Sequence, residues 1–460
     1  MISFLKKRPT LNDVRSFYMG NIYPAIIAAL VAFGSVFGIE VFTCICHTAL
    51  LFGAFIISKS VKPILISLFT YVMQVSVGNS PFYPNYSDYY YTGWRLPIMI
   101  ALGALTLVGI ICFVLKNGII KKISFKNTPL LLPLIILSSA FLLNGLFSGK
   151  WTFGNLAFGF GNVAAYLIVF VIIYHGLENE RSDDIAGYFA YISVLISLVI
   201  SSEIFANLLT NDNIFIDGAI NKVEMALGWG IWNLVGVSLS VLIPVIFYGM
   251  HKNKYPWLYF AAATLTYVMS VITMSRNALI FASLAYASSV IISCFVGKNK
   301  RVFRVITAIG ILMIFALAIV FREKIYALLG DYFSRGLSDN GRFALWKEAF
   351  GNFLKSPIFG GGFYGFDVET DVFGPLAKQA HNTPLQLLSA MGIFGFVSYA
   401  YYRYKSAVPL FKAPSLMKTM MAMSILVLLL GSLLDNFIFN IYPMFYYTLA
   451  LVIIHKTDKK

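Results

Sequence analysis

One hydrophilic stretch, residues 322–385, interrupts an otherwise apolar chain and holds the side chains best suited to chemistry. Arg342 and Trp346 lie in GRFALWKEAF, a glycine triplet follows in PIFGGGFYGF, and His381 stands beside Asn382 in AHNTPLQLLSAMGIFG. Guanidinium groups bind phosphate through paired hydrogen bonds, and a neutral imidazole accepts protons near neutral pH. These residue types predict a site that handles an anionic substrate beside a base.

Two further arginines border apolar segments, Arg95 in GWRLP and Arg276 in TMSRNALI. Ionisable groups at such borders are costly, which makes them functional candidates. The alternative for each is a side chain that reaches out to lipid phosphate, and Arg342 has the alternative of a solvated helix face. We therefore treat His381, Arg342 and Arg276 as candidate catalytic residues.

The candidate substrate-binding residues are chosen for their capacity to hold a sugar or an anion. Aromatic faces stack on the apolar faces of pyranose rings, and carboxamides bond to hydroxyl groups. Glycine N–H groups can approach an anion closely, although glycine triplets usually serve backbone geometry alone. The candidates are Arg95, Trp346, Gly361, Gly362 and Asn382.

No metal ion and no cofactor is expected from the sequence. No His, Cys, Asp or Glu cluster has the spacing of a metal site, and nucleotide-binding and nucleophile-elbow motifs are missing from the sequence. Asp367, Glu369 and Asp371 alternate in FDVETDVF and could hold a hard cation. A solvated acidic loop is the interpretation we favour for them.

The composition requires a membrane protein, because 59% of the residues are hydrophobic and 12% are charged. Apolar runs long enough to cross a bilayer recur throughout. The expected fold is all-α and polytopic, with about 12–14 transmembrane helices and one large extracytoplasmic loop that contains short helices. Residues 1–460 would form a single integral membrane domain. The apolar segments are 22–39, 41–57, 63–78, 96–115, 130–147, 157–175, 185–209, 229–250, 257–273, 277–296, 303–321, 386–402, 419–434 and 437–454.

The distribution of positive charge predicts the orientation of these segments. If the N-terminus is cytoplasmic, 24 of the 35 Lys and Arg residues fall on the cytoplasmic side. Both termini are then cytoplasmic, and the loop at 322–385 is extracytoplasmic. The net charge of +15 is explained by this asymmetry and by contact with anionic lipid head groups, so it does not indicate nucleic-acid binding.

A helix is expected over residues 340–355 of the loop. Phe343, Trp346, Phe350 and Phe353 form one apolar stripe along it. Asp339 or Asn340 can cap its start, and Pro357 ends it. Such a helix would lie on the outer leaflet, with its aromatic stripe in lipid or against the bundle.

The order of these motifs, SRN, GRFALWKEAF, SPIFGGGF and AHNTPLQLLSAMGIFG, resembles the signature region of the O-antigen ligase/polymerase superfamily over residues 270–400. The resemblance implies a metal-independent inverting glycosyltransferase that works on the outer side of the bacterial cytoplasmic membrane. Its donor would be a glycan on undecaprenyl diphosphate. The family's outer arginines correspond to Arg276 and Arg342 and its loop histidine to His381, whereas Arg95 matches no family position.

Two activities of this family remain open. A polymerase of O-antigen or capsule repeat units would transfer to another carrier-linked glycan, and a ligase would transfer to a lipid core or a protein. We favour the polymerase. A polytopic exporter of lipid-linked oligosaccharide is the alternative of a different class, and it would distribute charged residues through both halves of the chain.

Overall fold

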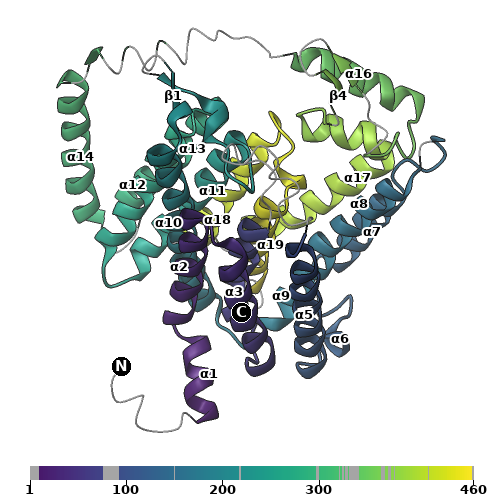
Figure 1. Ribbon diagram of the computed structural model, residues 1–460, viewed down its shortest axis with the longest axis horizontal. Helices are drawn as coiled ribbons and strands as arrows, with labels where there is room; N and C mark the ends of the chain where they lie inside the picture. The colour runs from purple at the N-terminus through teal and green to yellow at the C-terminus, as the bar shows by residue number, and fades with distance from the viewer. Residues whose placement is uncertain are drawn as a thin grey trace.

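The computed structural model is a bundle of helices (Figure 1). It describes residues 10–75, 93–149, 151–216, 219–296, 300–320, 341–363, 368–370, 374–377, 379–412 and 414–457, together with residues 322, 323, 326 and 330.

Most helices of the N-terminal half coincide with the apolar segments that the sequence predicts, whereas α1 and α6 lie outside those segments. They are α1 (Leu11–Met19), α2 (Ile22–Phe37), α3 (Glu40–Ile57), η2 (Lys62–Ile64), α4 (Leu65–Val75), α5 (Arg95–Lys116), α6 (Ile119–Lys122), α7 (Leu131–Leu142), α8 (Phe153–Val163), the π-helical turn η4 (Ala164–Ile168), α9 (Val169–Gly176) and α10 (Ser182–Thr210).

The C-terminal half continues in the same way, with two short antiparallel strand pairs that the sequence analysis did not anticipate. Its elements are η5 (Asp212–Ile214), β1 (Phe215–Ile216), β2 (Ala219–Ile220), η6 (Lys222–Met225), α11 (Trp232–Lys252), α12 (Pro256–Ile272), α13 (Arg276–Phe295), α14 (Lys300–Val320), α16 (Arg342–Lys355), β3 (Val368–Thr370), β4 (Gly374–Ala377), α17 (Thr383–Phe411), α18 (Leu416–Gly431), η7 (Phe437–Phe439) and α19 (Ile441–Thr457).

The all-α polytopic class is confirmed. Within the described residues, seven helices are long and apolar enough to cross a membrane, and α1 with α2, bent by 63°, makes an eighth if the pair is one span. Four more apolar helices have 10–17 residues and include α7, α12 and α18. The larger expected number of spans therefore depends on these shorter helices, and it stays a prediction.

Helix α11 is the centre of the bundle. Of its most apolar 18 residues 94% are buried, against 17% in α5 at the periphery. A helix that is apolar all round belongs in an interior, and α11 packs against α10, α12, α13 and α18. Gly236 permits the close approach of α13, since a Cβ there would lie 2.4 Å from the Cβ of Ala278.

Helix α17 is broken in the middle at Gly392, where φ is 64° and ψ is −162°. The break releases backbone groups that a continuous helix would pair. The carbonyls of Ser389 and Ala390 accept hydrogen bonds from the N–H groups of Gly361 and Gly362, at 2.8 and 2.9 Å. Backbone polar groups at membrane depth need such partners, so the glycine turn completes the broken helix.

Helix α16 begins and ends close to its predicted bounds and lies over the start of α17 (Figure 1). Its N-cap is Gly341 in a left-handed conformation, without a side-chain cap. Leu345 and Ala349 are buried against Ala380, with Trp346 partly buried beside them. Phe343 and Phe350 are exposed, which leaves part of the predicted aromatic stripe available to lipid.

Candidate functional site

The centre of the candidate site is a hydrogen-bonded pair, His381 and Asp435. His381 Nδ1 lies 2.9 Å from Asp435 Oδ1. The Asp435 side chain is 8% exposed and the His381 side chain 25% exposed, so the ring is the more accessible partner. The two residues come from different helix ends, His381 from the start of α17 and Asp435 from the turn after α18.

The backbone around His381 is fixed by bonds between these two helix ends. Asn382 caps α17, because its Oδ1 accepts the N–H of Leu385 at 3.0 Å, and its Nδ2 donates to the carbonyl of Leu433 at 2.9 Å. The N–H of Thr383 donates to the carbonyl of Ser432 at 2.9 Å. His381 itself has a φ of +47°, which is costly for a residue with a Cβ. The loop thus holds the histidine in place at the expense of local strain.

The pair has the arrangement of a base and its orienting group. A carboxylate that accepts the Nδ1 proton holds the imidazole in the tautomer whose Nε2 is basic. The same carboxylate stabilises the imidazolium that forms when Nε2 takes a proton. His381 can therefore act on a hydroxyl group, and Asn382, which we predicted to bind substrate, has both ends of its side chain engaged in holding the histidine loop.

Arg342 and Trp346 lie on the helix next to His381. Arg342 is the first residue of α16 and is partly buried. It shares a helix face with Leu345, three residues on, which packs against Ala380 beside the histidine. Trp346 packs against this cluster next to the His381 segment, and Arg342 begins the helix that carries it.

Arg276 lies at the same end of the bundle, although on a different helix. It is the first residue of α13, after the cap Ser275, and it is partly buried. The beginning of α11 separates it from the Asp435 turn, with Gly236 against Ala278 on one side and Val237 against Gly431 on the other. The bundle therefore places Arg276 at the same end as the pair, with the start of α11 between them. Arg95 begins α5, which packs mainly against α3.

Gly361 and Gly362 have a structural function in this fold. Their N–H groups donate hydrogen bonds to backbone carbonyls of α17, as described above. A Cβ at Gly362, where φ is +85°, would lie 2.4 Å from Asn155 Nδ2. These contacts explain the need for glycine, and they direct the two amides away from the anion-binding role that we predicted.

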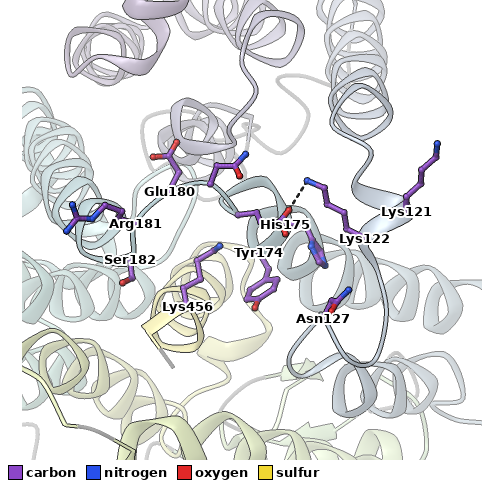
Figure 2. Close-up of a pocket in the computed structure, with 11 residues that line it drawn as sticks. Lys121, Lys122, Asn127, Tyr174, His175, Glu180, Arg181, Ser182 and Lys456 are labelled. Carbon is purple, nitrogen blue, oxygen red and sulfur yellow. Dashed lines mark ion pairs between the residues drawn. The ribbon is translucent and has the colours of Figure 1, made fainter. Parts of the chain in front are cut away.

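Another pocket lies at the other end of the bundle, and its charged side chains do not point toward a common centre. It has a volume of about 550 Å³ and lies near the ends of α6, α9 and α19. Figure 2 shows Lys122 reaching toward Glu178, at 2.8 Å, while Lys121 and Arg181 extend away to either side. The hydrogen bond from Lys122 lowers the pKa of Glu178. Because its cations point apart, we assign no chemistry to this pocket.

No group of three or more His, Cys, Asp or Glu side chains converges in the part of the chain that the structure describes. Asp367 and Asp371 lie outside the described residues, so the acidic loop is not part of that statement. The four cysteines, Cys44, Cys46, Cys112 and Cys294, are free thiols in the structure.

Asp435 is the residue that the sequence analysis undervalued. The sequence analysis did not pair it with His381. Its signal is its position, since it is the acidic residue that divides the apolar run between α18 and α19. An ionisable residue at such a break is costly in the membrane unless another group pairs with it.

Comparisons with known proteins identify the class of this polytopic membrane protein. Residues 260–400 match the family model described as O-antigen ligase. This range contains Arg276, Arg342 and His381, while Asp435 lies beyond it. No curated protein and no solved structure matches the chain. Over this range the chain is similar to the O-antigen ligase family, which supports the resemblance to the O-antigen ligase/polymerase superfamily.

Proposed function

We propose that the protein is a glycosyltransferase that polymerises undecaprenyl-diphosphate-linked oligosaccharide repeat units of a bacterial surface polysaccharide. The reaction takes place on the outer side of the cytoplasmic membrane. The observation that carries the proposal is the His381–Asp435 pair at 2.9 Å. His381, Arg276 and Arg342 all lie within the matched range.

The proposed reaction is a displacement at the anomeric carbon of the donor glycan. The acceptor hydroxyl gives its proton to His381 Nε2, and its oxygen forms the new glycosidic bond. The bond between the anomeric carbon and the diphosphate breaks, and the electron pair leaves with undecaprenyl diphosphate. Attack opposite the leaving group inverts the configuration. Asp435 keeps the Nδ1 proton in place throughout.

The arginines act on the leaving group. Negative charge grows on the diphosphate as the bond breaks, and guanidinium groups aimed at it stabilise the transition state without a metal ion. Arg342, on the helix face next to the histidine segment, and Arg276, across the first turn of α11, supply this charge. Arg95 is assigned to a more distant part of the carrier.

A ligase that transfers the carrier-linked glycan to a lipid core or to a protein is the second candidate, since the same pair would serve either acceptor. The test is incubation of the purified protein with carrier-linked repeat units as both donor and acceptor. A ladder of chain lengths supports the polymerase. A single transfer that appears only after a lipid-core or protein acceptor is added establishes the ligase, and no transfer with any acceptor rejects both.

A further inference from the structure

A small cavity next to the His381–Asp435 pair has the chemistry of a sugar subsite. Its volume is about 160 Å³, room for about five water molecules at ~30 Å³ each. Three phenylalanine rings and four carboxamides line it. The rings belong to Phe158, Phe363 and Phe439, and the carboxamides to Gln379, Gln386, Asn436 and Asn440.

Two of these carboxamides are buried and orient each other. Gln386 Oε1 accepts the backbone N–H of Ala380 at 2.7 Å and Asn436 Nδ2 at 3.1 Å. Because a backbone N–H can only donate, the oxygen of Gln386 must face Ala380 and its Nε2 must face the other way. Asn436 is fixed in turn, since the atom that it presents to Gln386 Oε1 must be its nitrogen.

This arrangement leaves one donor and one acceptor of two bonded, buried side chains to be satisfied. Gln386 Nε2 and Asn436 Oδ1 have no hydrogen-bond partner among the described residues, and each residue is 1% exposed. A buried polar group without a partner is costly and calls for a ligand or a water molecule. A hydroxyl group satisfies both atoms at once, because it accepts a bond from the donor and donates one to the acceptor.

The aromatic rings of the cavity suit the apolar faces of a sugar. The rings of Phe158 and Phe363 lie 4.2 Å apart between centroids, tilted by 37°, and Phe439 lies 5.2 Å from Phe363 at 70°. A pyranose presents apolar C–H faces and a rim of hydroxyl groups. Apolar walls with a few oriented polar groups are typical of a small-ligand site.

Hydrogen bonds also connect the cavity lining to the His381–Asp435 pair. Asp435 Oδ1 accepts both His381 Nδ1 and the N–H of Asn436, the latter at 2.8 Å. Ala380, which fixes Gln386, directly precedes His381. The cavity therefore borders the two segments that carry the pair, since its lining residues Gln379 and Asn436 are two and one residues from His381 and Asp435.

We propose that this cavity binds the terminal sugar of the acceptor glycan, with Gln386 and Asn436 bonded to one of its hydroxyl groups and the phenylalanine rings against its C–H face. The acceptor assignment rests on the proposed function, whereas sugar binding itself does not. Gln386 and Asn436 thereby select acceptors that carry a hydroxyl group at the recognised position.

The decisive variant is Gln386→Glu. Its retained carboxyl oxygen can still accept from Ala380 and Asn436, while the group facing the cavity changes from a donor to an acceptor. Phe439→Leu removes one ring and keeps an apolar side chain. Gln74→Glu is the matched control, because Gln74 is an equally buried glutamine of α4, bonded to His47 and remote from the cavity lining.

Binding is measured without any transfer reaction, by saturation-transfer NMR with free hexoses, deoxyhexoses and N-acetylhexosamines added to the purified protein. We expect at least one sugar to bind and its affinity to fall about tenfold or more in Gln386→Glu and in Phe439→Leu, as for the loss of one good contact. Gln74→Glu should bind as the wild type does. Thermal unfolding of each variant checks that the protein remains folded.

Two results would overturn the proposal. If no sugar binds the wild-type protein, or if binding is equal in wild type and Gln386→Glu, the cavity holds water only. If sugars bind as expected but the protein transfers no glycan, the subsite stands and the proposed function fails. Where transfer is active, Gln386→Glu should raise the acceptor KM more than it lowers kcat, which distinguishes acceptor binding from an effect on His381.

Discussion

His381 and Asp435 are 54 residues apart in the chain and 2.9 Å apart in the structure. Their contact joins the start of α17 to the turn after α18. The backbone N–H of Thr383 and the side-chain amide of Asn382 connect the same two segments. The pair is therefore built into the fold rather than formed by a chance approach of two side chains. A buried carboxylate behind a more exposed imidazole is the arrangement that a base needs.

Asp435→Asn should lower kcat by about 10²–10⁴-fold, the usual contribution of general-base catalysis. An amide at this position keeps the shape and can still accept the N–H of Asn436, but it carries no charge to stabilise the imidazolium. Steady-state transfer assays measure the loss, and a thermal unfolding midpoint near that of the wild type is the control. A variant with unchanged kcat would reduce Asp435 to a structural residue.

His381→Ala and the double variant His381→Ala/Asp435→Asn should be almost equally inactive. Residues that act as a unit give losses that do not add, since the second substitution removes a group that has already lost its partner. The transfer rates of the two single variants and the double variant supply the comparison. Losses that multiply would mean that the two residues act independently. The His381→Gln variant separates orientation from proton transfer, because an amide can orient a hydroxyl group but cannot take its proton.

Arg276→Ala and Arg342→Ala should each lower the transfer rate by about 10²–10³-fold, the range for one lost transition-state donor. Lysine should restore only part of the rate, because an ammonium lacks the planar fork of a guanidinium. Arg95→Ala, at the start of α5, provides a comparison with an arginine outside the matched domain. Normal turnover at a normal protein level in both alanine variants would assign the two arginines to lipid contact or to a solvated surface.

Transfer should continue in excess EDTA, because the proposed arginines supply the positive charge at the leaving diphosphate. The assay compares rates with chelator alone and after Mg²⁺ or Mn²⁺ is added back. Loss of activity that the cation reverses would give the acidic residues Asp367, Glu369 and Asp371 the metal-binding role that we did not favour.

The sequence was sufficient for most of the helices and for the family signature region. Hydrophobic length located the helices, and the helix over 342–355 emerged from its aromatic spacing. The match over residues 260–400 agrees with the signature region proposed at 270–400. These features depend on local pattern, which a single sequence records directly.

Features that depend on distant partners could not be predicted. Asp435 acquires its function from a residue in another helix, and Gly361 and Gly362 are explained by a break at Gly392 that the apolar pattern of α17 conceals. Asn382 resembles a ligand in sequence, but it is a cap in the structure because Leu385 and Leu433 take both ends of its amide. Such pairings belong to tertiary structure.

The orientation of the bundle gives the last prediction. Helix α16 and the ends of α1 and α6 lie on opposite sides of the molecule (Figure 1). The excess of Lys and Arg predicts that the α6 side is cytoplasmic and the α16 side external. In a variant with its four cysteines replaced, Glu348→Cys on α16 should react with an impermeant thiol reagent in intact cells, and Lys126→Cys, after α6, should react only after lysis. Both positions are exposed, so a difference in labelling reports the side of the membrane rather than burial. The reverse pattern would place His381 in the cytoplasm, where a carrier-linked glycan presented on the outer face could not reach it, and would reject the proposed reaction along with the orientation.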